Sequence, residues 1–202
     1  MSERAIPAGV FPPVPPHVPR LGPSSAAPVA RWLFAQRGWR VAGEFPDVAK
    51  LVLIAAPHST NWDVVWGLLV KVGLRLDVNF IGKREAFFWP LGAVLRHFGG
   101  IAIDRSHAQD VVAAMRAEFE RRDGFWLAIA PEGTRKKVQK WKSGFWRIAR
   151  EARVPILPVY FHYPEKTVGL GPLIEPTDDL ASDMARIREF YRPWLGKNRG
   201  TV

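Results

Sequence analysis

With 202 residues, 48% of them hydrophobic, the chain is long enough for one domain with a continuous core and too apolar for wholesale disorder. It contains no cysteine, which excludes disulfides, a thiolate nucleophile and cysteine metal sites. The 29 basic and 19 acidic residues give a net charge of +10, which should attract nucleic acid, an acidic membrane surface or phosphorylated substrates.

Membrane and targeting signals are weak in this sequence. The longest apolar runs, 51–56 and 64–70, are far shorter than the roughly 18 residues that a spanning helix needs. The first residues carry no charged start followed by an apolar stretch, so we expect no secretory signal. We therefore expect a cytoplasmic protein that is soluble, or peripheral on the cytoplasmic face of a membrane.

The chain begins with a proline-rich segment, residues 1–28, which holds eight prolines. This spacing favours extended, polyproline-like chain, so we predict an arm that wraps the domain or stays mobile, followed by the domain itself at 29–202. Residues 26–38 are predicted to form a short helix. Its apolar side chains are Val29, Trp32 and Leu33. Core packing is the expected role of this helix, and contact with lipid headgroups is the alternative, because tryptophan and arginine together suit that interface.

Short apolar strands and amphipathic helices then alternate. The predicted strands are 51–56, 78–82, 100–104, 125–130 and 155–160, and their continuous apolar character indicates burial on both faces. The predicted apolar faces of the helices are Val64, Leu68, Leu69 and Val72; Leu91, Val94, Leu95 and Phe98; Val111, Val112, Met115 and Phe119; Phe145, Ile148 and Ala152; and Met184, Ile187, Tyr191 and Trp194. This alternation predicts a single α/β domain with a largely parallel or mixed central sheet flanked by helices.

Polar residues gather directly after the predicted strands. They are His58, Lys83, Arg84, Arg105 and the segment Glu132, Gly133, Thr134 and Arg135. In an open parallel sheet, ligands bind beyond the carboxyl ends of the strands. The sequence therefore predicts that four separate regions of the chain meet at one edge of the sheet.

The first of these regions contains His58 and, five residues later, Asp63. The two residues would be about 140° apart on one helix, so they can meet only if the histidine lies in the strand-to-helix turn and the aspartate in the first helical turn. An aspartate beside one imidazole nitrogen fixes the tautomer and leaves the other nitrogen to accept a proton. The pair is therefore interpreted as a general base and its orienting carboxylate.

A purely structural interpretation of this pair stays open, in which Asp63 caps the helix and His58 is a bystander. A metal site is not expected, because no second histidine or carboxylate stands near His58 at ligand spacing.

The segment after the predicted strand 125–130 contains a glycine and an arginine. Gly133 permits a tight turn, and the guanidinium of Arg135 suits a phosphate. Glu132 is expected to orient that arginine or to bond an acceptor hydroxyl. One alternative for this segment is a solvated basic loop. Another is a nucleic-acid-binding segment, in which bases stack beside its cations.

Together these motifs resemble the glycerolipid (lysophospholipid) acyltransferase family, which contains the 1-acylglycerol-3-phosphate acyltransferases. Four blocks within roughly residues 50–160 match in order: His58 to Asp63 as His-x-x-x-x-Asp; Gly100 to Arg105, preceded by Gly82-Lys83-Arg84-Glu85; Pro131 to Arg135, followed by Lys142 to Phe145; and Val154 to Val159. The chain resembles a compact member without an N-terminal transmembrane helix.

The resemblance implies transfer of a fatty acyl group from acyl-CoA or acyl carrier protein, as co-substrate, to a hydroxyl of a lysophospholipid such as 1-acylglycerol-3-phosphate. It implies that His58, oriented by Asp63, is the general base. The residues implied to bind the acceptor phosphate are Arg105, Glu132, Gly133, Thr134 and Arg135. Further substrate-binding candidates are Lys83, Lys142 and Pro155.

The expected partners are thus an acyl thioester, a phosphorylated hydroxyl acceptor and the surface of an anionic membrane, with no metal, no other cofactor and no nucleic acid. The alternatives are a basic, non-catalytic protein that binds membranes or nucleic acid, and a hydrolase that acts on acyl thioesters.

Overall fold

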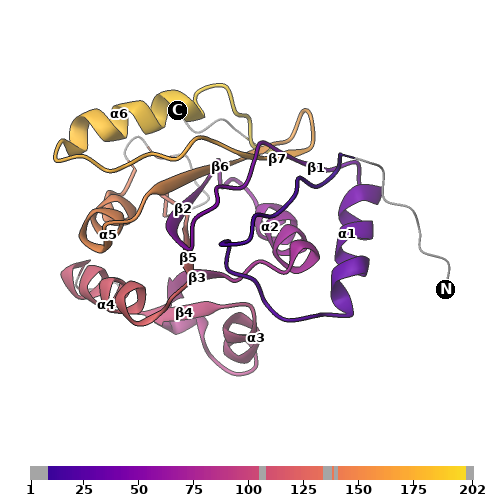
Figure 1. Ribbon diagram of the computed structural model, residues 1–202, viewed down its shortest axis with the longest axis horizontal. Helices are drawn as coiled ribbons and strands as arrows, with labels where there is room; N and C mark the ends of the chain where they lie inside the picture. The colour runs from indigo at the N-terminus through magenta and orange to yellow at the C-terminus, as the bar shows by residue number, and fades with distance from the viewer. Residues whose placement is uncertain (1–8, 105–107, 134–137, 139–140, 199–202) are drawn as a thin grey trace.

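The centre of the molecule is a seven-stranded sheet with helices on both faces, seen in a computed structural model that describes residues 9–104, 108–133, 138 and 141–198 (Figure 1). The strand order is β1-β7-β6-β2-β5-β3-β4. The β6–β7 pair is antiparallel, and the other neighbouring pairs are parallel. The predicted α/β class with a largely parallel, mixed sheet is confirmed.

The strands follow the continuous apolar runs of the sequence. They are β1 (Arg40–Ala42), β2 (Lys50–Ala56), β3 (Val78–Lys83), β4 (Gly100–Ile103), β5 (Phe125–Ile129), β6 (Ile156–His162) and β7 (Thr167–Leu170). The short outer strands β1 and β7 were not predicted. Because β2 to β6 all run in the same direction, their carboxyl ends meet at one edge, hereafter the carboxyl edge.

The helices connect these strands and divide between the two faces. They are α1 (Ala26–Gln36), α2 (Asn61–Leu74), the short 3-10 helix η1 (Arg84–Ala86), α3 (Leu91–His97), α4 (Ala108–Arg121), α5 (Gly144–Ala152) and α6 (Leu180–Tyr191). The connections through α2 and α3 advance along the sheet in the same direction, so right-handed crossovers place both helices on one face, together with α1 (Figure 1). Helices α4, α5 and α6 cover the other face.

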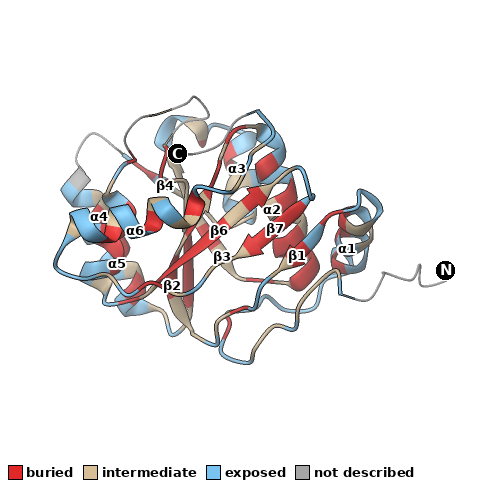
Figure 2. Cartoon of the chain, turned by 90° about the horizontal axis from the view of Figure 1, so that it is seen from above, coloured by how far each residue is buried: buried red, intermediate tan, exposed pale blue. Residues whose placement is uncertain are grey.

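The face covered by α4, α5 and α6 is packed as the sequence predicts. Met115 and Phe119 of α4, Phe145 of α5 and Ile187 of α6 are buried in one cluster with strands β2, β5 and β6. Figure 2 shows the buried sides of these helices turned toward the sheet and their exposed sides turned to solvent. The predicted apolar faces of the last three helices are confirmed in these residues.

The predicted apolar faces of α1, α2 and α3 are confirmed only in part: Leu69 packs against the core, but most of the fully buried residues are others. The buried residues of α1 are Ala27, Ala30 and Phe34, and the hydrophobic ones of α2 are Trp66, Val70 and Leu74. By contrast, the predicted face residues Val29, Leu33, Val64, Leu91 and Val94 are exposed. These helices carry apolar residues on more than one side, so periodicity alone could not decide which side packs.

The α5 and α6 helices are joined by a buried carboxylate. Asp183 accepts hydrogen bonds from Nε1 of Trp146 at 2.8 Å and from the backbone N–H of Thr177 at 2.6 Å. Burial acts to raise the pKa of Asp183, but these hydrogen bonds lower it below the ordinary value of 3.8. Tyr191 connects the end of α6 to the sheet, because its hydroxyl is hydrogen-bonded to the carbonyls of Ile54 and Val159.

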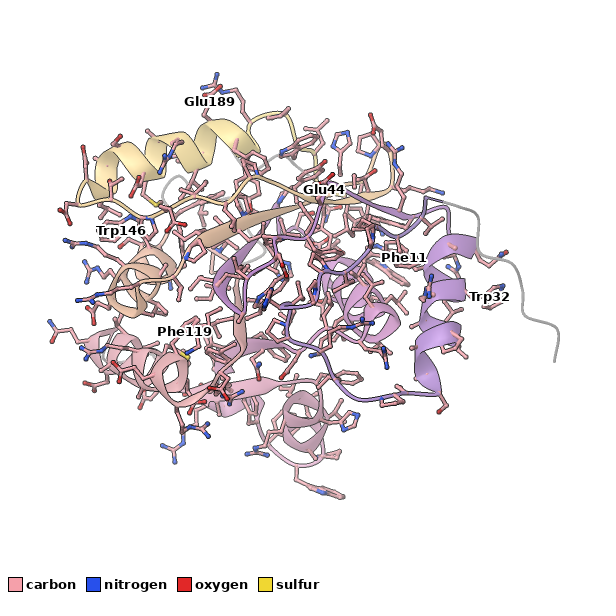
Figure 3. The ribbon with its side chains drawn as sticks, in the orientation of Figure 1. Phe11, Trp32, Glu44, Phe119, Trp146 and Glu189 are labelled. Carbon is pink, nitrogen blue, oxygen red and sulfur yellow. The ribbon has the colours of Figure 1, made fainter. Side chains whose placement is uncertain are left out.

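The described part of the proline-rich arm wraps around the domain. Phe11 lies beside α1 (Figure 3), where its ring is 5.3 Å from that of Phe34. Val18 is buried, and the carbonyl of Pro19 accepts a hydrogen bond from the N–H of Asp77 at 2.8 Å. The extended arm thus covers the α1 and α2 side of the core.

Candidate active site

The turn between β2 and α2 places His58 at the carboxyl edge of the sheet. β2 ends at Ala56, a cis peptide bond joins it to Pro57, and α2 begins at Asn61. Thr60 is the N-cap of α2, and Asp63, three residues later, completes a capping box with it. The local sequence therefore fixes the start of the helix three residues after His58.

The carboxylate of Asp63 is buried and held from two sides. Its Oδ2 accepts hydrogen bonds from the backbone N–H groups of Ser59 at 2.7 Å and Thr60 at 2.8 Å. Its Oδ1 accepts a 2.6 Å hydrogen bond from the hydroxyl of Tyr163. With a side-chain exposure of 0%, this carboxylate has little freedom to move.

The imidazole of His58 faces this carboxylate. Its Nδ1 lies 3.6 Å from Oδ2 of Asp63, longer than a hydrogen bond but within ion-pair distance. The His58 side chain keeps 18% of its surface exposed, so it remains reachable from solvent. The structure thus brings the two predicted residues together, and Asp63 caps the helix as well.

Glu132 reaches the same turn from the end of β5. It is buried, with 2% exposure, and its Oε1 accepts a hydrogen bond from the backbone N–H of His58 at 3.0 Å. The next residue, Gly133, has φ +65° in the left-handed region, and its N–H bonds to the carbonyl of Ala130 at 3.0 Å. This tight turn brings Glu132 back to the turn of His58. The sequence interpretation did not predict this contact.

Two predicted lysines are also at the carboxyl edge. Lys83 is the last residue of β3 and is exposed. Lys142 is exposed as well, and its N–H donates to the carbonyl of Pro131 at 2.9 Å. Its side chain crosses Gly133, where an added Cβ would lie 3.1 Å from Cε of Lys142. Both lysines therefore place positive charge on the β5 and β3 side of His58.

Three of the predicted phosphate-binding residues, Arg105, Thr134 and Arg135, lie outside the described residues. Within the part of the chain that is described, there is no group of three His, Asp or Glu side chains that could hold a metal ion.

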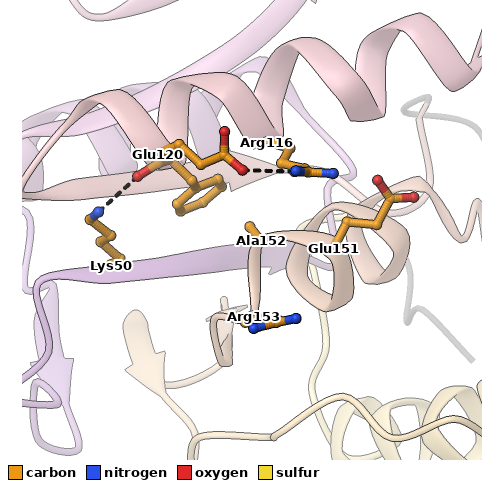
Figure 4. Close-up of a pocket in the computed structure, with 7 residues that line it drawn as sticks. Lys50, Arg116, Glu120, Glu151, Ala152 and Arg153 are labelled. Carbon is orange, nitrogen blue, oxygen red and sulfur yellow. Dashed lines mark hydrogen bonds and ion pairs between the residues drawn. The ribbon is translucent and has the colours of Figure 1, made fainter.

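Pro155 is not part of this group. Its carbonyl accepts a hydrogen bond from the N–H of Val52, near the start of β2, whereas His58 follows the end of that strand. A pocket of about 450 Å³ is on the same amino side of the sheet (Figure 4). Its lining residues include Lys50, the first residue of β2, and Arg153, just after α5. Pro155 therefore stands at the opposite end of β2 from His58, and its contact with substrate stays a prediction.

Tyr163 is the site residue that the sequence interpretation missed. It follows the carboxyl end of β6, a predicted strand after which the sequence interpretation placed no polar site residue. Burial and then the hydrogen bond to the carboxylate of Asp63 raise the pKa of Tyr163 well above the ordinary value of 10.0, so the hydroxyl remains a donor. The rule that located His58 and Glu132 would also have located this tyrosine.

Comparisons with known proteins identify the fold and the family. The crystal structure of the 1-acyl-sn-glycerophosphate (LPA) acyltransferase PlsC from Thermotoga maritima has the same fold, with a TM-score of 0.56 and 18% sequence identity, over 80% of this chain and 73% of that chain. No curated protein sequence matches the chain significantly. A family model described as Acyltransferase matches residues 40–162, from the start of β1 to the end of β6. Because this match spans more than half of the chain, the protein belongs to the acyltransferase family, as its motifs indicate.

Proposed function

We propose that the protein transfers a fatty acyl group from acyl-CoA or acyl carrier protein to a hydroxyl of a lysophospholipid such as 1-acylglycerol-3-phosphate, the acceptor class named for PlsC. The observation that supports this most directly is the 3.6 Å approach of Nδ1 of His58 to the buried, hydrogen-bonded carboxylate of Asp63. In a family of acyltransferases, such a pair serves to activate the attacking hydroxyl.

The reaction begins when Nε2 of His58 accepts the proton of the acceptor hydroxyl. The oxygen attacks the thioester carbonyl, the carbon–sulfur bond breaks, and the imidazolium returns its proton to the departing thiolate. Asp63 favours the tautomer that carries a proton on Nδ1 and stabilises the imidazolium. A base oriented in this way accelerates proton transfer by roughly 10²–10⁴-fold.

Glu132 positions His58 in this proposal. Its buried carboxylate accepts the N–H of His58 and, being negative, would repel a phosphate at close range. The acceptor phosphate is assigned instead to Arg105 and Arg135, with Lys83 and Lys142 adding positive charge on the same side of His58. Gly133 and Thr134 directly precede Arg135 in the sequence and stay assigned to the same phosphate.

The test is a thiol-release assay with a panel of acyl thioesters and lysolipid acceptors. His58→Ala should lower acceptor-dependent turnover at least 100-fold while the unfolding midpoint stays near that of the wild type, because the ring is partly exposed. Arg135→Ala should raise KM for phosphorylated acceptors. Normal turnover by His58→Ala would refute the assignment of His58 as the general base. Thiol release at a rate that does not depend on added acceptor would favour a thioester hydrolase. Salt-dependent binding of lipid or nucleic acid without turnover would favour a non-catalytic protein.

We also propose that the protein meets its lipid acceptor at an anionic membrane surface, from the cytoplasmic face. No described helix has both the length and the apolar character needed to cross a membrane. However, exposed apolar residues concentrate on α2 and the segment before and within α3, neighbouring elements on one face of the sheet (Figures 1 and 2). We call these residues the apolar patch: Val64, Val65, Phe88, Trp89, Leu91 and Val94.

The position and charge of the apolar patch favour a membrane. Trp89 is 86% exposed and Phe88 is 60% exposed, and both follow β3 close to the carboxyl edge that carries His58. Residues 86–103 contain no acidic side chain but include Arg96. Exposed aromatic residues beside cations suit the headgroup region, and a membrane bound there would present its lipids to the catalytic edge.

Co-sedimentation with vesicles of anionic and of neutral phospholipid tests this contact. Phe88→Ser with Trp89→Ser should reduce binding to anionic vesicles about tenfold or more, since two large aromatic contacts with the bilayer are lost. Leu21→Ser removes a comparably exposed leucine outside the apolar patch and serves as the matched control. Equal binding by both variants, or no binding of the wild type at low salt, would refute the membrane contact.

A further inference from the structure

A second pocket, of about 300 Å³, lies beside the His58–Asp63 pair. It is lined by Arg37, Trp39, Trp62, Trp66, Tyr163, Lys166 and Lys197. We call it the tryptophan pocket. Tyr163 connects it to the site already described, because this residue both lines the pocket and donates its hydroxyl to Asp63.

Three indole rings form the wall of the tryptophan pocket. The ring of Trp66 stacks against that of Trp39, with centroids 4.7 Å apart, and against that of Trp62, with centroids 5.8 Å apart. Trp39 and Trp66 are buried, which holds the stack in place, whereas Trp62 is 45% exposed. The outer ring thus offers a flat aromatic surface, fixed in advance, to a planar group.

The rim of the tryptophan pocket is cationic. Nζ of Lys197 lies 5.8 Å from the centre of the Trp62 ring, and Nζ of Lys166 donates to the carbonyl of Arg37 at 3.2 Å. No carboxylate is among the residues that line the pocket. Aromatic walls alone would suit a quaternary ammonium group, but three like charges repel such a ligand. The lining favours an anion that carries a planar ring.

The order of the strands places this pocket on the other side of His58 from Lys83 and Lys142. β2, which precedes His58, has β5, β3 and β4 on one side, and these strands lead to Lys83 and to the residues predicted to bind the acceptor phosphate. On its other side are β6, β7 and β1, which lead to or flank Tyr163, Lys166 and Trp39. An acyl transfer needs two substrates that meet at the base, and described cations stand on both sides of it: Lys83 and Lys142 on one, and Arg37, Lys166 and Lys197 on the other.

We infer that the tryptophan pocket binds the nucleotide end of an acyl-CoA donor, which deepens the proposed function and rests on it. The adenine ring stacks on the exposed indole of Trp62, and the phosphates of the nucleotide contact Arg37, Lys166 and Lys197. The arm of an acyl carrier protein has a single phosphate and no base, so it lacks the group that the indoles recognise. The pocket thereby selects coenzyme A over a carrier protein as donor.

Coenzyme A binding to the lipid-free protein, followed by quenching of tryptophan fluorescence and by calorimetry, tests the site directly. Trp62→Ala should weaken binding about 5- to 100-fold, the range for loss of one base stack. Trp32→Ala removes a tryptophan of α1 outside the pocket and should leave binding unchanged. Arg37→Ala with Lys197→Ala should weaken binding about tenfold or more at low salt, whereas Arg147→Ala on α5 should not.

Two donors separate nucleotide recognition from chemistry. Trp62→Ala should raise KM for acyl-CoA by the same factor as its loss of affinity, with little change for an acyl thioester of phosphopantetheine, which has no nucleotide. Wild-type affinity of Trp62→Ala for coenzyme A, equal losses with both donors, or competition between coenzyme A and the phosphorylated acceptor would overturn the inference. Trp62-dependent binding in a protein without acyl transfer would support the pocket while refuting the proposed function.

Discussion

Asp63 holds both the start of α2 and the imidazole of His58, and two substitutions separate these roles. Asn keeps a carbonyl oxygen that can accept the N–H groups of Ser59 and Thr60, but it loses the charge that stabilises an imidazolium. Ala loses both. The structural interpretation of this residue, a helix cap beside a bystander histidine, predicts no activity loss for Asn.

The expected losses of stability and of turnover follow from the contacts of Asp63. Asp63→Ala removes the capping interaction, worth about 1–2 kcal/mol, and leaves the Tyr163 hydroxyl without its 2.6 Å partner, at a cost of about 1–3 kcal/mol. We expect a loss of about 3 kcal/mol in the free energy of unfolding. Asp63→Asn should cost about 1 kcal/mol, because the amide oxygen still accepts the N–H groups of Ser59 and Thr60, whereas an NH2 group replaces the oxygen that accepts the Tyr163 hydroxyl. Turnover should fall about 10²–10⁴-fold in both variants.

Urea unfolding measures the stability of each variant, and the thiol-release assay at saturating donor measures kcat. The informative comparison is Asp63→Asn, which should be nearly as stable as the wild type and nearly inactive. If this variant keeps a kcat within about threefold of the wild type, Asp63 only caps the helix, and the assignment of His58 as a general base loses its support.

Tyr163→Phe should lower kcat about tenfold with KM unchanged, because the hydrogen bond to Asp63 is lost, and steady-state kinetics that show only a KM effect would contradict this. Glu132→Ala should lower kcat 10- to 100-fold whereas Glu132→Gln, which keeps an acceptor for the N–H of His58, retains most activity; equal losses would contradict a positioning role. Asp183→Asn should cost about 2 kcal/mol of stability at pH 7. Because the folded pKa of Asp183 is lowered, the wild-type advantage in unfolding experiments should be complete above about pH 5 and fade as pH falls below 3.8.

The sequence by itself determined the five strands β2 to β6 and the meeting of His58, Asp63 and Glu132 at their carboxyl edge. Strands covered on both faces are continuous apolar runs, and this local signal does not depend on which strands become neighbours. A glycine turn after one strand and a histidine after another converge at one edge in any sheet where those strands are parallel. His58, Asp63 and Glu132 therefore followed from the chain order alone.

Tertiary structure decided which helix faces are buried and what surrounds the pair. α1 and α2 have apolar residues on several sides, and the packing of Phe34, Trp66 and Trp39 against the sheet selects the buried side. The contact of Tyr163 with Asp63 spans 100 residues of sequence, and the edge to which Pro155 belongs depends on the direction of β6. Such contacts depend on strand order and on packing between distant segments, which no local pattern of residues encodes.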